Sequence, residues 1–328
     1  MSGGPSFKRI DYSIRWNKQI ERKAIFERIQ RSEIVSSNSH RYVGLGSIWF
    51  SDFVIAHRMF SLEDMVSFEY PENCSRAEAN VPYACIKLIP GDCNDKLIEM
   101  DAAWWSKPLL IWLDYDGIAE NEVLKTLEEI LQRSLKGSIL IVTVNAVRDS
   151  YRPNIDATKK RACETLNELF GDSAQQTVGE EDFTVAAFPG ALSQSMLNRM
   201  SEVLRLSARG ISNDQLSFLP LFKFAHKDNA QMITVGGAIV DGELKSTSLK
   251  KLKWESAEIE QQPALETINI EPLTLREKIA LDKLMPHVVG PADLIRKARD
   301  AKLQLDAEQL NAYSRYYRHF PIFAEMWV

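Results

Sequence analysis

The chain has 328 residues and a formal net charge of -5, with 45% hydrophobic and 26% charged residues. This composition is typical of a globular protein with one large domain and accessories, or with two domains. The acidic charge balance does not support nucleic acid as a partner. No apolar run approaches the ~18 residues of a membrane span, no signal peptide is recognisable, and the four cysteines lack CxxC spacing, so we expect a cytoplasmic protein with free thiols.

Hydrophobic periodicity divides the first half of the chain into alternating helices and strands. It predicts an amphipathic helix over 11–31, a strand over 41–46, a helix over 47–60 capped by Ser47, strands over 64–70, within 84–97, over 108–117 and over 138–146, and a helix between 121 and Gly137. The predicted strands carry continuous apolar runs, and helical patterns follow several of them. This pattern indicates an α/β fold with a parallel sheet buried on both faces.

The second half of the chain begins with a mostly helical pattern and then changes character. Residues 218–242 predict a hairpin with "HKDN" at its turn, and 245–263 predict a polar linker before a helical tail. These changes divide the chain into three expected parts: an N-terminal helical cap at 1–39, a core at 40–242 with a helical insertion at about 155–208, and a linker with a helical accessory domain at 243–328.

The stretch "RYVGLGSIWFSDF" places two glycines, Gly44 and Gly46, at the end of the first predicted strand. A dehydrogenase site for NAD needs a third glycine for close packing of helix on strand. The bulky Trp49 stands near that position, which argues against an NAD-dependent dehydrogenase.

Polar residues also end the later predicted strands. Glu69 ends the second strand, Asp92 and Cys93 follow the third, and Asp114 ends the fourth. In open α/β sheets, ligands bind at the carboxyl ends of the strands, so these residues indicate one binding site.

The order "VGLGS … FE … GDC … IWLDYD … ILIVTVN", closed by a hairpin, resembles the class I S-adenosylmethionine-dependent methyltransferases over about residues 40–240. The resemblance implies a Rossmann-like, mostly parallel sheet with a C-terminal antiparallel hairpin, S-adenosylmethionine as cofactor, and methyl transfer. The whole pattern also looks like orphan O-methyltransferase proteins of bacterial accessory gene sets, so we expect an oxygen nucleophile as acceptor.

The resemblance also implies a role for each strand end. The glycine loop would pass under the methionine part of the cofactor, the second-strand acid would hold the ribose, and the turn after the third strand would flank the adenine. The matching cofactor-binding residues are Gly44, Gly46, Ser47, Glu69, Asp92, Cys93 and Asp114. Two features depart from the family pattern: "HRYVGLG" lacks the usual acidic residue on the first strand, and the fourth strand lacks the "NPPY" signature of base methylation.

The "WLDYDG" stretch supplies the candidate catalytic residues Asp114 and Asp116, with Tyr115 between them expected to face the substrate. It resembles the "DAD" strand end of metal-dependent O-methyltransferases, but Val144 stands where that site needs a second aspartate, so no metal is expected. Asp116 or His57 could act as the base toward an oxygen nucleophile. Alternatively, the two aspartates cap the following helix and bind the cofactor amine.

The N-terminal helix carries Arg15, Lys18 and Arg22 near one another on one face. Since helices before the first strand often cover the cofactor in the resembled superfamily, these residues are predicted to contact an acidic substrate or to close a lid. A solvated helix face is the alternative. His226 is expected near solvent in the hairpin and, like His287, to be structural.

The aromatic-rich end, "AYSRYYRHFPIFAEMWV", predicts packing or an interface, so the C-terminal helices are expected to contact a second copy of the chain or a partner protein. Two functions remain open for the whole chain. The first is methyl transfer to an unidentified acceptor. The second is a catalytically silent cofactor-binding module that acts as a sensor or scaffold in an assembly.

Overall fold

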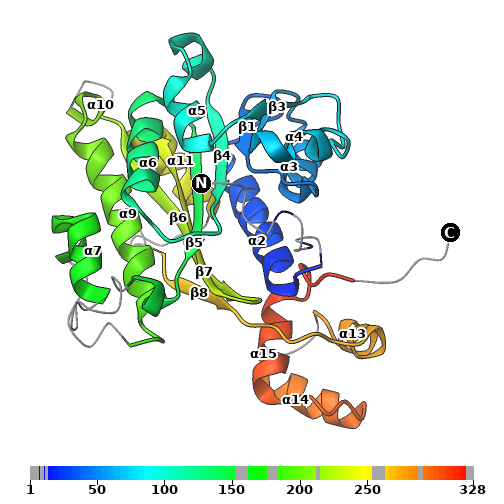
Figure 1. Cartoon of the computed structure of the whole chain (residues 1–328). Helices are drawn as coiled ribbons and strands as arrows, with labels where there is room; N and C mark the ends of the chain where they lie inside the picture. Colours follow the sequence, from blue (N-terminus) through cyan, green and yellow to red (C-terminus); the bar gives the residue numbers. More distant parts are fainter. Residues whose placement is uncertain are drawn as a thin grey trace.

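The computed structural model describes residues 7, 11, 14–151, 162–175, 184–211, 215–252, 263–286 and 291–322. At its centre lies an eight-stranded sheet with the strand order β3-β2-β1-β4-β5-β7-β6-β8 (Figure 1). The strands are β1 (Arg41–Gly44), β2 (Met65–Glu69), β3 (Ile86–Pro90), β4 (Leu109–Asp114), β5 (Ile139–Asn145), β6 (Ser217–Lys227), β7 (Gln231–Val240) and β8 (Leu265–Ile268).

The sheet confirms the predicted α/β fold class. The strands β1 to β5 pair in parallel, and β7 pairs antiparallel with both β5 and β6. The buried runs of β4 and β5 explain this arrangement, since both strands are almost entirely covered on both faces. The hairpin lies where it was expected. The sequence did not predict β8, a short strand that pairs in parallel with β6.

Helices cover both faces of the sheet (Figure 1). Adjacent residues of a strand point to opposite faces, so Val43 packs in one hydrophobic core and Tyr42 in the other. The first core includes side chains of α5 (Cys93–Glu99), α6 (Asn121–Arg133), α7 (Ala162–Phe170) and α9 (Phe188–Leu206). The second includes side chains of α2 (Trp16–Ser32), α3 (Ser51–Phe60), α4 (Pro71–Glu78), α11 (Gly242–Leu252), α13 (Leu275–Asp282), α14 (Pro291–Asp300) and α15 (Ala307–Tyr316).

Shorter helical segments connect these elements: the 3₁₀ turns η1 (Ala102–Ser106) and η2 (Arg148–Tyr151), and the helices α8 (Asp172–Gln175) and α10 (Ala208–Ile211). Within the described residues, no helix is long and apolar enough to cross a membrane.

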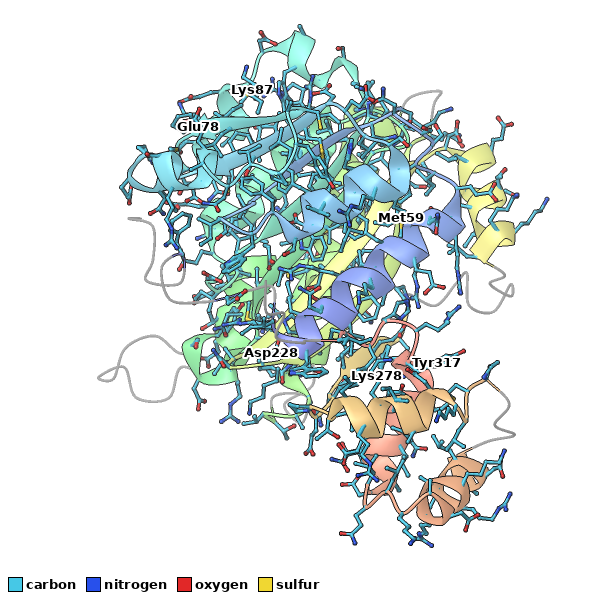
Figure 2. All side chains as sticks on the ribbon, turned by 90° about the vertical axis from the view of Figure 1, so that its right-hand side faces the viewer. Met59, Glu78, Lys87, Asp228, Lys278 and Tyr317 are labelled. Carbon is cyan, nitrogen blue, oxygen red and sulfur yellow. The ribbon has the colours of Figure 1, made fainter. Side chains whose placement is uncertain are left out.

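The helix α2 crosses the second face of the sheet between α3, which carries Met59, and the C-terminal helices (Figure 2). Its first turn is joined to the hairpin and to the segment after β8. The side chain of Asn17 donates to the Lys227 carbonyl oxygen at 3.0 Å and accepts from the Ile270 backbone N–H at 2.8 Å. The Asp228 carboxylate accepts from the backbone N–H groups of Asn17 and Lys18 at 3.2 Å each.

A buried charge network joins α2 to the sheet. The fully buried Glu21 accepts from His226 Nδ1 at 2.9 Å and lies 3.2 Å from Lys18 Nζ. His226 is therefore buried, which makes the expectation of a solvent-exposed hairpin histidine wrong. Burial alone would raise the pKa of Glu21, but His226 and Lys18 outweigh it and hold that pKa well below 4.5. Glu21 is thus a buried carboxylate that stays charged.

Several boundaries differ from the sequence prediction. Ser47 does not cap the helix after β1, because α3 begins at Ser51 with Phe50 as its N-cap residue in the left-handed conformation. The helix α6 ends at Arg133, before Gly137. The helix α11 occupies part of the segment predicted as a linker.

The C-terminal helices pack onto α2 and the edge of the sheet. Tyr313, Tyr316 and Phe320 are buried within this chain, which is the packing alternative predicted for the aromatic-rich end. His319 Nε2 lies 2.6 Å from Glu27 of α2. His287 lies outside the described residues.

We predict that Glu21→Gln destabilises the fold by about 3 kcal/mol, because it removes the negative partner of two buried groups. The matched control Glu33→Gln removes an exposed pair with Lys251 and should cost less than about 1 kcal/mol. Urea unfolding measures both free energies.

The contribution of Glu21 to the free energy of unfolding should decrease at low pH. Since the folded pKa of Glu21 lies below its ordinary value of 4.5, its stabilisation is complete above pH 4.5 and is lost as the pH falls further. Glu21→Gln should lack this loss. Equal unfolding free energies for the two variants would contradict a stabilising network.

Candidate active site

A pocket with a volume of about 340 Å³ lies at the carboxyl ends of β1, β2, β3 and β4. In the sheet, β2 and β3 follow β1 on one side, whereas β4 and β5 lie on its other side. The strand order therefore reverses between β1 and β4, and a crevice opens at such a point in an α/β sheet. The sequence-predicted residues that line it are Gly46, Ser47, Glu69, Asp92, Cys93, Asp114, Tyr115, Asp116 and Arg22. The topology therefore brings strand ends far apart in the sequence to one cavity.

The loop after β1 forms one wall of the pocket. The Gly46 N–H donates to Ser67 Oγ at 3.0 Å, and a side-chain Cβ at Gly46 would lie 2.4 Å from the Phe50 ring. Glycine is thus required by the ring that packs against the loop. Gly44 is not among the lining residues, but a Cβ at this position would meet Asp52, which is one of them. Among the described residues, Ser47 Oγ is buried and has no hydrogen-bond partner.

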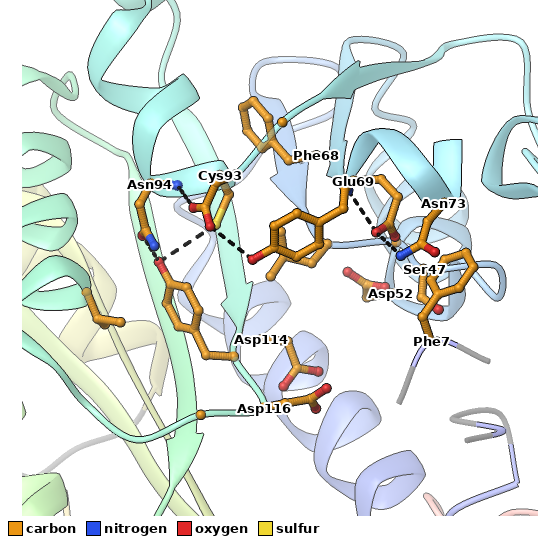
Figure 3. Close-up of a pocket in the computed structure, with 18 of the residues that line it drawn as sticks. Phe7, Ser47, Asp52, Phe68, Glu69, Asn73, Cys93, Asn94, Asp114 and Asp116 are labelled. Carbon is orange, nitrogen blue, oxygen red and sulfur yellow. Dashed lines mark hydrogen bonds between the residues drawn. The ribbon is translucent and has the colours of Figure 1, made fainter. Parts of the chain in front are cut away.

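The second strand ends in Glu69, which faces the pocket beside Asn73 (Figure 3). One carboxylate oxygen, Oε1, accepts from the Tyr70 backbone N–H at 2.9 Å and from Asn73 Nδ2 at 3.2 Å. Burial raises the pKa of Glu69, although these two donors act in the opposite direction. The partners hold the carboxylate in one orientation.

The turn after β3 forms the opposite wall of the pocket. Asp92 caps α5 by accepting from the Asn94 backbone N–H at 2.8 Å, and its other oxygen accepts from the Tyr70 hydroxyl at 2.9 Å. The Tyr115 hydroxyl donates to Asn94 Oδ1 at 2.6 Å. Burial and the charge of Asp92 raise the pKa of the Cys93 thiol to about 12, so this cysteine is a neutral packing group. Figure 3 shows Cys93 and Asn94 on this wall.

Asp114 ends β4 and forms an ion pair with the N-terminal helix. Lys18 Nζ lies 2.9 Å from Asp114 Oδ1, and Lys18 itself is buried. Burial alone would lower the pKa of Lys18, but Asp114 and Glu21 outweigh it and raise that pKa. Asp116 lies two residues further along the pocket wall (Figure 3).

The three basic residues predicted on α2 have different surroundings. Arg22 is buried and lines the pocket, whereas Lys18 is buried behind Asp114. Arg15 is the residue before the first turn of α2, and it is not one of the described residues that line the pocket. The alternative prediction, a solvent-exposed helix face, is therefore wrong for Lys18 and Arg22. The alternative base, His57, bonds the Leu62 carbonyl oxygen at 2.8 Å and lies outside the pocket lining.

Sequence reasoning missed three acidic residues of this pocket: Glu120 and Glu122 at the start of α6, and Asp52 in the first turn of α3. Asp52 accepts a hydrogen bond of 2.5 Å from the Tyr42 hydroxyl, and its Oδ2 would lie 3.2 Å from a Cβ at Gly44. Burial raises the pKa of Asp52. Its only sequence signal is an acid at the start of the helix after the glycine loop. The aromatic residues Phe7, Trp49 and Tyr70 also line the pocket.

Among the described residues, no group of three or more His, Cys, Asp or Glu side chains is placed to hold a metal ion. The described residues that line the pocket present carboxylates, one guanidinium and aromatic rings around a glycine loop, on a Rossmann-like sheet that includes the β7–β6 hairpin.

A family model described as "Putative O-methyltransferase" matches residues 10–328. The chain belongs to this O-methyltransferase family, which confirms the resemblance found in the sequence. A comparison with curated proteins found no match.

Solved structures of methyltransferases are similar to the chain at low identity. Trm1 from Pyrococcus horikoshii, in complex with S-adenosyl-L-methionine, has 11% identity and a TM-score of 0.41 over 70% of this chain and 57% of that chain. N-methyltransferase NodS from Bradyrhizobium japonicum WM9, in complex with S-adenosyl-l-homocysteine, has 9% identity and a TM-score of 0.36 over 67% and 87%. An O-methyltransferase family protein from Burkholderia thailandensis has 12% identity and a TM-score of 0.31 over 69% and 59%. The family assignment rests on the sequence match.

We predict that Gly46→Ala destabilises the fold by about 1–3 kcal/mol, because the new methyl group must displace the Phe50 ring. Gly242→Ala is the control, since a Cβ at that position meets no atom within 4 Å. Urea unfolding compares the two variants. A loss at Gly242 as large as that at Gly46 would contradict the packing explanation.

Proposed function

We propose that the chain transfers the methyl group of S-adenosylmethionine to an oxygen acceptor. The observation that carries the proposal is the ordered set of groups around one pocket: the Gly46 loop after β1, Glu69 after β2, Asp92 after β3 and Asp114 after β4. This order along four neighbouring strand ends matches the order of the parts of an extended nucleoside cofactor.

The residues present are chemically suited to that cofactor. Glu69 is held by Tyr70 and Asn73 through one oxygen, and a carboxylate can accept two hydrogen bonds from a ribose diol. The buried hydroxyl of Ser47 lacks a partner within the described chain and lines the pocket, so it can bond a polar ligand group. Asp92 is already bonded by Asn94 and Tyr70, and we assign it to holding the wall beside the adenine.

At the fourth strand end we assign different roles to the two aspartates. The cofactor, when bound, supplies an electrophilic methyl group. Asp114 Oδ1 lies 2.9 Å from Lys18 Nζ, so this ion pair holds the Asp114 carboxylate against the N-terminal helix. Asp116 lines the pocket two residues further along and is the proposed base that accepts the proton of the acceptor hydroxyl, while Asp114 positions the reacting groups. Tyr115, whose hydroxyl is bonded to Asn94, is a rigid wall and not a proton donor to substrate.

The ion pair between Lys18 and Asp114 also favours the second candidate function, a cofactor-binding module without catalysis, because it occupies one of the two aspartates expected to act on substrate.

In either case we propose a cytoplasmic location, since Cys74, Cys85 and Cys93 are free thiols. A partner protein or second copy at the C-terminal helices and a bacterial accessory role remain parts of the proposal.

The first test is a titration of the purified chain with S-adenosylmethionine, S-adenosylhomocysteine and NAD. A ligand at 100 times its dissociation constant adds about 2.7 kcal/mol of stability, which a thermal melt detects. We expect both adenosyl ligands to stabilise the chain and NAD to have no effect. Glu69→Ala should abolish the shift, whereas Glu78→Ala, an exposed acid of the neighbouring helix α4, should retain it. Stabilisation by NAD alone would overturn the proposal.

The formation of S-adenosylhomocysteine across a panel of hydroxyl and carboxyl acceptors separates the two candidate functions. For an active transferase we expect Asp116→Asn to lower turnover by about 10²- to 10⁴-fold while cofactor affinity stays unchanged. Cofactor binding without turnover on any acceptor supports the silent module.

A further inference from the structure

The first strand lacks the acid that the resembled family places before its glycine loop, yet the structure holds a carboxylate at the same strand end. Asp52 comes from the first turn of α3, and its Oδ2 would lie 3.2 Å from a Cβ at Gly44, the last residue of β1. The carboxylate thus lies against the loop from the helix side. Asp52 also lines the pocket (Figure 3).

The orientation of Asp52 is held by the strand itself. The buried Tyr42 hydroxyl donates to Asp52 Oδ2 at 2.5 Å, and Tyr42 packs edge-on against Phe53. Because Tyr42 is on β1 and Phe53 is on α3, the strand and helix together hold the carboxylate. A carboxylate has two oxygens with about four acceptor sites, so the bonds from the Tyr42 hydroxyl and from the backbone N–H of Asp52 leave acceptor capacity for a ligand cation.

A positive charge lines the same pocket. Arg22 of α2 is buried and acts electrostatically on Asp52, lowering a pKa that burial raises. A guanidinium remains charged at all accessible pH values and suits carboxylates through paired N–H groups. The pocket therefore presents one buried positive group from α2 and one negative group from α3 near the glycine loop.

An amino-acid zwitterion carries one carboxylate and one ammonium on the same carbon, so opposite charges at one end of a pocket are complementary to it. Resting on the proposed function, we infer that Asp52 binds the ammonium group and Arg22 binds the carboxylate of the amino-acid part of S-adenosylmethionine. Asp52 thereby replaces the missing first-strand acid. The N-terminal helix becomes a specificity-determining wall of the cofactor site and not only a cover.

The inference predicts how affinity depends on the ligand. 5′-Methylthioadenosine retains the adenosine and the thioether but lacks the zwitterion, and decarboxylated S-adenosylmethionine lacks only the carboxylate. Isothermal titration of the wild-type chain should give affinities for S-adenosylhomocysteine at least about tenfold above those for 5′-methylthioadenosine, as expected for paired charges in a water-poor site. This comparison needs no variant.

Two variants separate the two charges. Asp52→Asn keeps a hydrogen-bond acceptor for the Tyr42 hydroxyl. It should lower the affinity for S-adenosylhomocysteine by about 10- to 100-fold, while the affinity for 5′-methylthioadenosine should change by less than about twofold. Arg22→Met should remove the preference of the wild type for S-adenosylmethionine over its decarboxylated form. The matched controls are Asp95→Asn, an exposed acid in the first turn of α5, and Arg31→Met, an exposed arginine of α2. Both controls should bind all ligands as the wild type does.

The outcomes separate this inference from the proposed function. If the wild type binds neither adenosyl ligand, the proposed function fails and the inference fails with it. If the wild type binds S-adenosylhomocysteine and 5′-methylthioadenosine equally, or if Asp52→Asn weakens both alike, the cofactor assignment stands and the zwitterion site is overturned. In that case Asp52 and Arg22 form an internal structural pair. Binding of 5′-methylthioadenosine by each variant also reports that its pocket is folded.

Discussion

The buried ion pairs of α2 are the constraint on which the pocket depends. Burying a charge is costly unless its partner is in place, so α2 is stable only where Lys18 meets Asp114 and Glu21 meets His226. Arg22 lies four residues after Lys18 and therefore projects from nearly the same helix face. The network that holds the helix on the sheet thus also sets the position of the pocket's positive charge. Strand ends, the glycine loop and the first turns of neighbouring helices supply the remaining polar groups.

The parts of the site that could be predicted from the sequence are those encoded by adjacent residues. Glu69 and Asp114 end apolar strands, and Asp92 follows one, so their place at the carboxyl edge follows from the fold class alone. Asp52 could not be found in this way. It reaches the edge because Ser47 and Phe50 adopt left-handed backbone conformations that turn the chain into α3, and neither residue has a strong preference for that region.

The parts that sequence reasoning missed depend on contacts between distant segments. His226 lies in a polar stretch that indicates solvent, but its partner Glu21 is 205 residues earlier in the chain. The strand β8 is short and carries polar residues, yet it pairs with the exposed edge of β6 and completes the sheet. By contrast, the helix starts at Thr274 and Asp306 were predictable, because each capping box is made within four residues.

The packing of Phe50 against Gly46 also changes what the glycine motif signifies. A glycine that is needed only for contact with a ligand can be lost once the ligand is no longer bound. Here the ring of a core phenylalanine imposes the same requirement, so selection for folding alone retains the motif. Members of the family that have lost cofactor binding are therefore expected to keep Gly46. Divergence at Glu69 and Asp52, whose carboxylates face the cavity, is the better marker of a change in function.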